Sequence, residues 1–215
     1  DFFSSAYERG GALAVEALYG LWTLIQRYNV TYPDFWKQLY ALVGYTDLWQ
    51  LPHLPRFFRL LNIFLSSVQL SDRLVAAFVK RTARQALRAP TPVLLFVLPF
   101  LYNTLKRHNN VIGLLHDAAD AAAAADLTDE AGFPIGFRVA ADPFVADEAN
   151  PEDANAMDSS LWELMALKQH AVPSVAALVR LFEEPLVRPI YVLDEFFGET
   201  YASMAATALD KTAAK

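Results

Sequence analysis

The sequence contains no cysteine among its 215 residues. This absence excludes a disulfide framework, cysteine-bound zinc, iron–sulfur clusters and a thiol nucleophile, and it fits a reducing compartment. Long apolar runs are missing as well. The most apolar stretch, VLLFVLPFLY, covers only residues 93–102, whereas a helix needs about 20 residues to cross a bilayer. We therefore expect a buried helix there and no membrane association.

The first residues, DFFSSAYERGG, include neither an initiator methionine nor a signal-peptide pattern. We therefore expect the chain to be part of a longer protein.

Motifs for catalysis and nucleotide binding are also missing. No serine lies in a GxSxG pattern, no P-loop or GxGxxG is present, and the 4 histidines show no HExxH spacing. We expect no enzyme activity, no cofactor and no metal, although a catalytic site assembled from distant residues stays an open alternative. For His170 we expect local packing, or capping of the helix that precedes it.

Acidic residues crowd one stretch, DPFVADEANPEDANAMDSS at 142–160. Its six carboxylates are Asp142, Asp147, Glu148, Glu152, Asp153 and Asp158. They could bind a metal, perform acid–base chemistry, or form a solvated connection between helices. An EF-hand register starting at Asp147 fails, because Ala149, Pro151 and Glu152 stand where oxygen ligands and a glycine are required. We expect a solvated connection, with a loose divalent-cation site as the alternative.

Basic residues are concentrated elsewhere. Residues 54–107 hold nine Lys or Arg against one acid, while residues 108–215 hold six against eighteen. Lys80, Arg84 and Arg88 recur at i, i+4 and i+8, with Arg81 beside them and Arg56, Arg59 and Arg73 nearby in the sequence. This basic row could be a solvated helix face, could pair with an acidic partner or with the chain's own acidic stretch, or could neutralise RNA phosphates.

Apolar residues recur at helical spacing almost throughout, and no five-residue stretch alternates as a half-buried strand would. The predicted helices cover 12–28, 31–44, 56–70 and 71–89, a fifth starts at Thr91 and Pro92, two more cover 159–170 and 172–184, and a last one begins at Asp194. In the first helix we expect Leu13, Ala17, Leu21, Leu24 and Tyr28 to face inward.

Three local signals refine these helices. Pro99 removes a backbone donor, so it should kink the fifth helix or divide it into two short ones. Ser160 and Glu163 have the spacing of a capping box. Asp194 can cap the last helix.

Helical periodicity stops between residues 116 and 157, where an alanine-rich tract, the segment AGFPIGF and the acidic stretch follow one another. We expect an irregular or partly disordered connector there. The sequence therefore predicts one all-α domain over residues 1–215, a HEAT-like α-solenoid or irregular array of antiparallel helix pairs with one long acidic connector.

Several short segments of the sequence resemble those of a known family. RFFRLLNIFLSS (56–67), LVAAFVKRTARQAL (74–87), PFLYNTLKRH (99–108), DPF (142–144) and SSLWEL (159–164) are similar to the conserved C-terminal region of the nucleolar complex protein four branch of the CCAAT-binding factor family. The resemblance covers about residues 2–205. Ala171 and Val145 depart from the family pattern, where Tyr and Asp are expected.

The resemblance implies a non-enzymatic ribosome biogenesis factor of the small-subunit processome, located in the nucleolus. It also implies a nucleolar-protein-fourteen-like partner, other processome proteins as neighbours, and a scaffold role in pre-rRNA maturation. Direct binding of pre-rRNA through the basic row is the alternative.

Two sets of residues are candidates for anchoring or partner binding. The first set, Trp162, Glu163 and Leu164, comes from the SSLWEL motif. The second set is inferred from charge alone: Arg56, Arg59, Lys80, Arg81, Arg84 and Arg88. We expect Trp162, with Leu161 and Leu164, to dock onto earlier helices while the acidic stretch stays solvated or meets the basic row.

Overall fold

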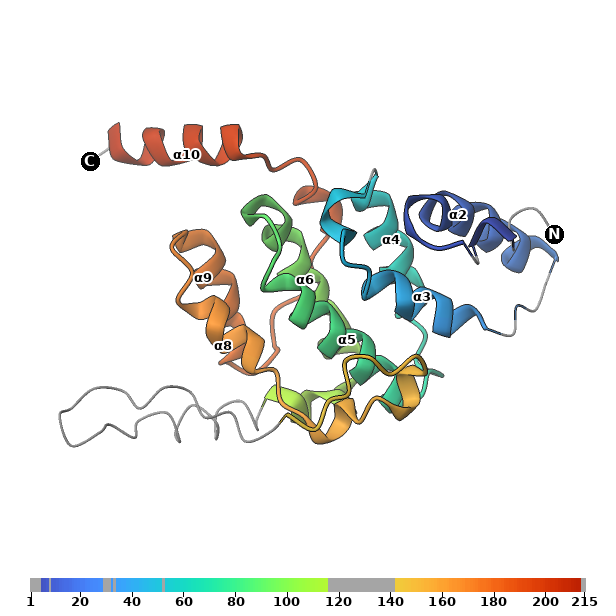
Figure 1. Ribbon diagram of the computed structural model, residues 1–215. Coiled ribbons are helices and arrows are strands. Elements are labelled where there is room, and N and C mark those ends of the chain that lie inside the picture. Colours follow the sequence, from blue (N-terminus) through green and yellow to red (C-terminus); the bar gives the residue numbers. More distant parts are fainter. Residues whose placement is uncertain are drawn as a thin grey trace.

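The fold is built from helices (Figure 1). The structure is a computed structural model that describes residues 5–7, 9–28, 32, 34–51, 53–115 and 142–213. Within these ranges every regular element is an α-helix or a 3-10 helix, and none is a strand. The all-α prediction is confirmed, whereas the HEAT-like geometry stays a prediction. The alanine-rich tract and the AGFPIGF segment lie outside the described residues.

Helices α2 to α6 form most of the core. They are α2 (Gly11–Tyr28), α3 (Phe35–Val43), α4 (Leu54–Phe64), α5 (Asp72–Ala86) and α6 (Thr91–Arg107). Two 3-10 helices, η1 (Leu48–Gln50) and η2 (Asn109–Ile112), join or extend them. In space α2 contacts α3, α3 contacts α5, and α5 contacts α6, so α5 lies in the middle of the row.

The later helices are α8 (Trp162–Lys168), α9 (Pro173–Val179), η6 (Arg180–Phe182), η7 (Leu193–Glu195) and α10 (Tyr201–Ala213). Of these, α8 and α9 are short and continue the row on the other side of α6, whereas α10 lies apart from the row (Figure 1). Helix α9 packs on α6 and on α8. One continuous cluster of buried apolar residues extends from Ala6 to Leu193.

The buried face of α2 differs in part from the predicted one. Leu13 is 46% exposed and Tyr28 69% exposed, whereas Ala14 and Leu18 are fully buried. Only Ala17 and Leu21 of the predicted inward residues are buried. Apolar residues occur on several sides of this helix, so the helical spacing does not decide which stripe meets α3.

Helix α6 is continuous through Pro99, so the prediction of two short helices is wrong. A proline inside a helix costs roughly 3 kcal/mol. Every residue from Leu94 to Leu105 is buried, and each large apolar side chain buried there contributes about 1.5–3 kcal/mol. The burial of this helix therefore outweighs the hydrogen bond that Pro99 cannot donate.

Two helix ends also differ from the predicted ones. Helix α4 stops at Phe64, and the Ser66 hydroxyl donates to the Ile63 carbonyl at 2.6 Å, a local bond that competes with the helical ladder. Asp194 does not cap α10, because it lies in η7 and pairs with Arg59. Thr200 takes the capping role, since its Oγ1 accepts from the Ser203 N–H at 3.1 Å.

The described part of the acidic connector, residues 142–161, contains no α-helix. It has two 3-10 turns, η4 (Pro151–Asp153) and η5 (Ala156–Asp158), and both contact α5. The Val145 N–H donates to the Ala154 carbonyl at 3.0 Å, which closes the stretch into a compact loop. In Figure 1 this loop lies across one end of α5.

Among the described helices, none combines the length and the apolar character that a bilayer span requires.

Candidate functional site

The candidate site lies where the acidic connector crosses α5, and its centre is Lys80. Helix α5 is covered by α3, by α6 and by the connector, so the Lys80 side chain is 0% exposed. A buried ammonium is strongly unfavourable unless it is paired and hydrogen-bonded. The surroundings of Lys80 must therefore supply negative charge.

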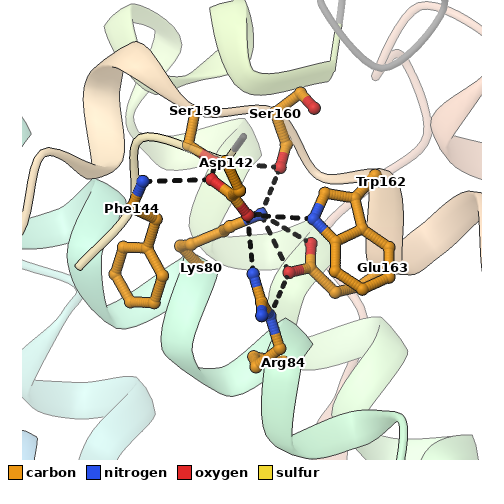
Figure 2. Close-up of polar contacts among 8 residues, drawn as sticks. All are labelled: Lys80, Arg84, Asp142, Phe144, Ser159, Ser160, Trp162 and Glu163. Carbon is orange, nitrogen blue, oxygen red and sulfur yellow. Dashed lines mark hydrogen bonds and ion pairs between the residues drawn. The ribbon is translucent and has the colours of Figure 1, made fainter. Parts of the chain in front are cut away.

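Two carboxylates and a second cation meet Lys80 (Figure 2). The Lys80 Nζ lies 3.0 Å from Asp142 Oδ2 and 2.8 Å from Glu163 Oε1, and it donates to the Ser160 carbonyl. Arg84 donates from Nε to Glu163 Oε1 at 2.7 Å and from Nη2 to Asp142 Oδ2 at 2.6 Å. Two cations thus face two carboxylates, and we call these four residues the α5 clamp.

Asp142 is the most highly coordinated member of the α5 clamp. Besides the two cations, its carboxylate accepts from the Phe144 N–H at 3.0 Å, the Ser159 hydroxyl at 2.6 Å and the Trp162 Nε1 at 2.9 Å. Burial alone would raise its pKa. The hydrogen bonds from Ser159, Trp162, Lys80 and the Phe144 N–H outweigh burial and lower the pKa to about 2.

Aromatic rings enclose the cations. The Trp162 ring centroid lies 5.4 Å from Lys80 Nζ and 4.8 Å from Arg84 Cζ, and the Phe144 ring lies about as far from both. These distances are within the range of cation–π attraction. The DPF and SSLWEL motifs therefore meet on α5, and each motif provides one carboxylate and one aromatic ring.

The ion pairs of the α5 clamp are suited to structural attachment. Each carboxylate is already neutralised by a cation, and a carboxyl with a pKa near 2 is a poor general acid or base at neutral pH. Within the described part of the chain, no group of three or more His, Asp or Glu residues could hold a metal ion. The α5 clamp fastens Asp142, at the beginning of the described connector, and Glu163, in the first turn of α8, to one helix.

Arg81 makes a second attachment beside the α5 clamp. Its Nη2 donates to the Ala146 carbonyl at 2.6 Å and to the Glu148 carbonyl at 2.8 Å, while Nη1 donates to the Tyr40 carbonyl at 3.1 Å. Its guanidinium lies 3.3 Å from the Tyr40 ring centroid. Burial lowers the pKa of Arg81 and raises that of Tyr40 to about 12. Arg81 thereby joins α3, α5 and the connector.

The motif residues take separate positions. Trp162 is half-buried over the cations, Glu163 is a member of the α5 clamp, and Leu164 is buried in the core with Leu161. The predicted capping box is wrong, because Leu161 is the N-cap residue of α8 and no side chain makes a capping hydrogen bond there. The Glu163 carboxylate instead pairs with Lys80 and Arg84.

The other basic candidates do not come together. Arg56 lies over the Tyr19 ring and 3.8 Å from Glu16, and Arg59 pairs with Asp194. Arg88 is exposed and forms no ion pair with any described residue. As partner-binding residues, all nine candidates stay a prediction.

The acidic stretch divides between two environments. Asp147, Glu152, Asp153 and Asp158 are exposed, while the Asp142 side chain is only 14% exposed. Sequence reasoning placed Asp142 in the connector without a specific role, and it also missed Phe144 and Ser159. The position of these residues inside the DPF and SSLWEL motifs was the available signal that they belong to the site.

Comparison with known proteins agrees with the family resemblance of the DPF and SSLWEL motifs. The model of the CBF/Mak21 family matches residues 14–179. Nucleolar complex protein 4 of Saccharomyces cerevisiae is 36% identical over 211 residues, covering 95% of this chain and 38% of the yeast protein. The homologues of Danio rerio and Homo sapiens are 41% and 40% identical over 186 and 189 residues, covering 86% and 88% of this chain.

The chain spans about a third of the length of these relatives, with 38%, 32% and 33% of their sequences aligned. The family match includes α5, Asp142 and Glu163, and therefore the whole α5 clamp.

Proposed function

The chain belongs to the CBF/Mak21 family, and from this premise we propose that it is a non-enzymatic scaffold in ribosome biogenesis. The family resemblance of its sequence motifs is confirmed by relatives that share the name nucleolar complex protein 4. The same relatives confirm the predicted nucleolar localisation. In finer detail, we propose that it acts in small-subunit pre-ribosome maturation. There it would bind a nucleolar-protein-fourteen-like partner among other small-subunit processome proteins.

The single observation that carries the scaffold proposal is the family relationship. The geometry of the α5 clamp supports it, because its four charged residues pair with one another and are used for internal attachment. Lys80 and Glu163 are 0% exposed, so they hold the connector in one conformation. A fixed connector presents Asp147, Glu152, Asp153 and Asp158 on the surface, where a partner of opposite charge can meet them.

Direct pre-rRNA binding through the basic row has less support. RNA affinity depends on the number of phosphates that basic side chains neutralise. Lys80 and Arg81 are buried, and the charge of Arg84 is already balanced by Asp142 and Glu163. Of Lys80, Arg81, Arg84 and Arg88, only Arg88 is exposed without an ion pair among the described residues.

The experiment is affinity purification of the tagged protein from its own cells, after nuclease treatment at moderate salt. Mass spectrometry then identifies the bound proteins. Recovery of a nucleolar-protein-fourteen-like assembly factor is the expected result. An assembly that disappears with nuclease would favour RNA binding, and the absence of ribosome assembly factors would contradict the proposal.

A pair of charge reversals separates the two modes. Arg88→Glu changes the exposed cation of the basic row, and Arg73→Glu changes an exposed cation near the other end of α5. Protein-mediated recovery should be equal for both variants. A selective loss with Arg88→Glu that becomes smaller as the salt concentration rises would favour phosphate contacts, because salt weakens the same contact in the unmodified protein.

A further inference from the structure

A hollow that none of the α5 clamp residues lines lies between α9, the start of α6 and α10. It has a volume of about 960 Å³. One wall carries Ala177, Leu178 and Leu181, and the floor includes Leu95, Tyr191 and Phe196. The other wall is α10, with Met204 and Ala205. We call this hollow the α9–α10 groove.

Helix α10 has little support from the rest of the fold. In Figure 1 it extends away from the other helices. Of its side chains that the structure describes, Ser203 and Met204 are half-buried and none is buried. The Tyr201 hydroxyl accepts from the Thr91 N–H at 3.3 Å, which holds the first turn near α6.

The apolar residues of α10 nevertheless form a stripe. Tyr201, Met204, Ala205 and Leu209 recur at i, i+3, i+4 and i+8, the pattern of a helix that buries one face. Yet Tyr201 is 62% exposed and Leu209 70% exposed. A helix of 13 residues is marginal in water without such burial, so the stripe requires a cover.

The volume of the groove is large enough for a short helix to be that cover. A helix about 10 Å wide, rising 1.5 Å per residue, fills on the order of 120 Å³ per residue. The volume of about 960 Å³ therefore accommodates about eight residues, or roughly two helical turns. Such a helix would bury its apolar face against α9 on one side and α10 on the other.

The charges at the groove indicate what kind of helix fits. Arg188 and Glu199 both line it, and neither forms an ion pair within the described part of the chain. A complementary ligand carries an acid beside Arg188 and a base beside Glu199. A nucleic acid does not match a mostly apolar groove with one cation. An amphipathic protein helix with charges of both signs does.

We propose that the α9–α10 groove binds an amphipathic helix from a protein partner, with α10 as one wall of the binding site. This inference rests on the proposed scaffold function and names the surface that serves it. Recognition follows the helix-in-groove mode, in which apolar residues at i, i+3, i+4 and i+7 anchor the ligand.

The first test uses exposed alanines, so that folding is preserved. Ala177→Asp with Ala205→Asp places a charge on each wall, and Ala166→Asp on α8 is the matched control because it is exposed and outside the groove. In the tagged protein we expect at least about a tenfold loss of one co-purifying protein with the double variant, and none with the control. Equal recovery from both would overturn the groove proposal.

The second test identifies the ligand by photo-crosslinking in cells, with a benzophenone amino acid at position 177 or at the control position 166. We expect a crosslink from 177 to a protein segment with amphipathic helical spacing. A crosslink to a second copy of this chain, to RNA or to nothing, while the assembly still co-purifies, would overturn the groove proposal and leave the scaffold function standing. Loss of the assembly from the unmodified protein would instead overturn both.

Discussion

Replacing Lys80 by methionine tests whether the α5 clamp holds the connector. Methionine keeps the length and apolar stem of the side chain but removes the charge between Asp142 and Glu163. Removing one partner from a buried ion pair costs about 3–5 kcal/mol, because the remaining charge stays uncompensated. Arg84 still contacts both carboxylates, so we expect the lower end, about 3 kcal/mol.

The assay is equilibrium unfolding in urea, followed by circular dichroism and tryptophan fluorescence. A loss of 3 kcal/mol in a chain of this size corresponds to a decrease in Tm of about 6–12 °C. Arg73→Met is the matched control, since Arg73 is an exposed cation of the same helix. It should change the unfolding free energy by less than about 0.5 kcal/mol.

A double variant shows whether the loss comes from charge. Lys80→Met with Glu163→Gln restores neutrality, leaving Arg84 opposite Asp142. The double variant should therefore be more stable than the sum of the two single losses indicates, by about 1 kcal/mol or more. Additive losses, or a Lys80→Met loss below about 1 kcal/mol, would refute a clamp based on charge.

Three further outcomes follow from the same geometry. Because the pKa of Asp142 falls from 3.8 to about 2 on folding, its contribution of roughly 2 kcal/mol is complete above pH 4 and is lost as the pH falls from about 4 to 2. Asp142→Asn should flatten the stability profile over that window, and an unchanged profile in acid titration would contradict it. Trp162→Ala removes a half-buried ring and the donor to Asp142, so thermal unfolding should show a loss of about 2–4 kcal/mol, and an unchanged Tm would count against docking. Gly44→Ala should cost about 1–2 kcal/mol in urea, because a Cβ would lie 3.1 Å from the Arg81 guanidinium, whereas Arg88→Ala should stay within about 0.5 kcal/mol.

Local patterns in the sequence were sufficient for most of the helices. The spacing of apolar residues predicted α2, α3, α4 and α5, and the Thr91–Pro92 pair predicted where α6 begins. These signals act within one or two turns, so they do not depend on the rest of the fold. Phe57, Leu60, Leu61 and Phe64, which share one face of α4 at helical spacing, are buried.

Contacts between distant residues produced the differences. Pro99 stays inside one helix because the whole of α6 is buried, and the α2 stripe is chosen by its neighbour α3. The sequence did not indicate that Thr200 caps the start of α10, because Asp194 is an equally good capping residue. In the fold Asp194 pairs with Arg59, and Thr200 makes the capping bond.

The sequence by itself determined the helical class of this protein, its family motifs and the charge asymmetry between its halves. Only the tertiary structure decided where those charges meet. Lys80 and Glu163 are 83 positions apart, and Arg84 and Asp142 are 58 apart. No local rule pairs residues at such separations, because burial of α5 under the connector is what makes each charge require the other.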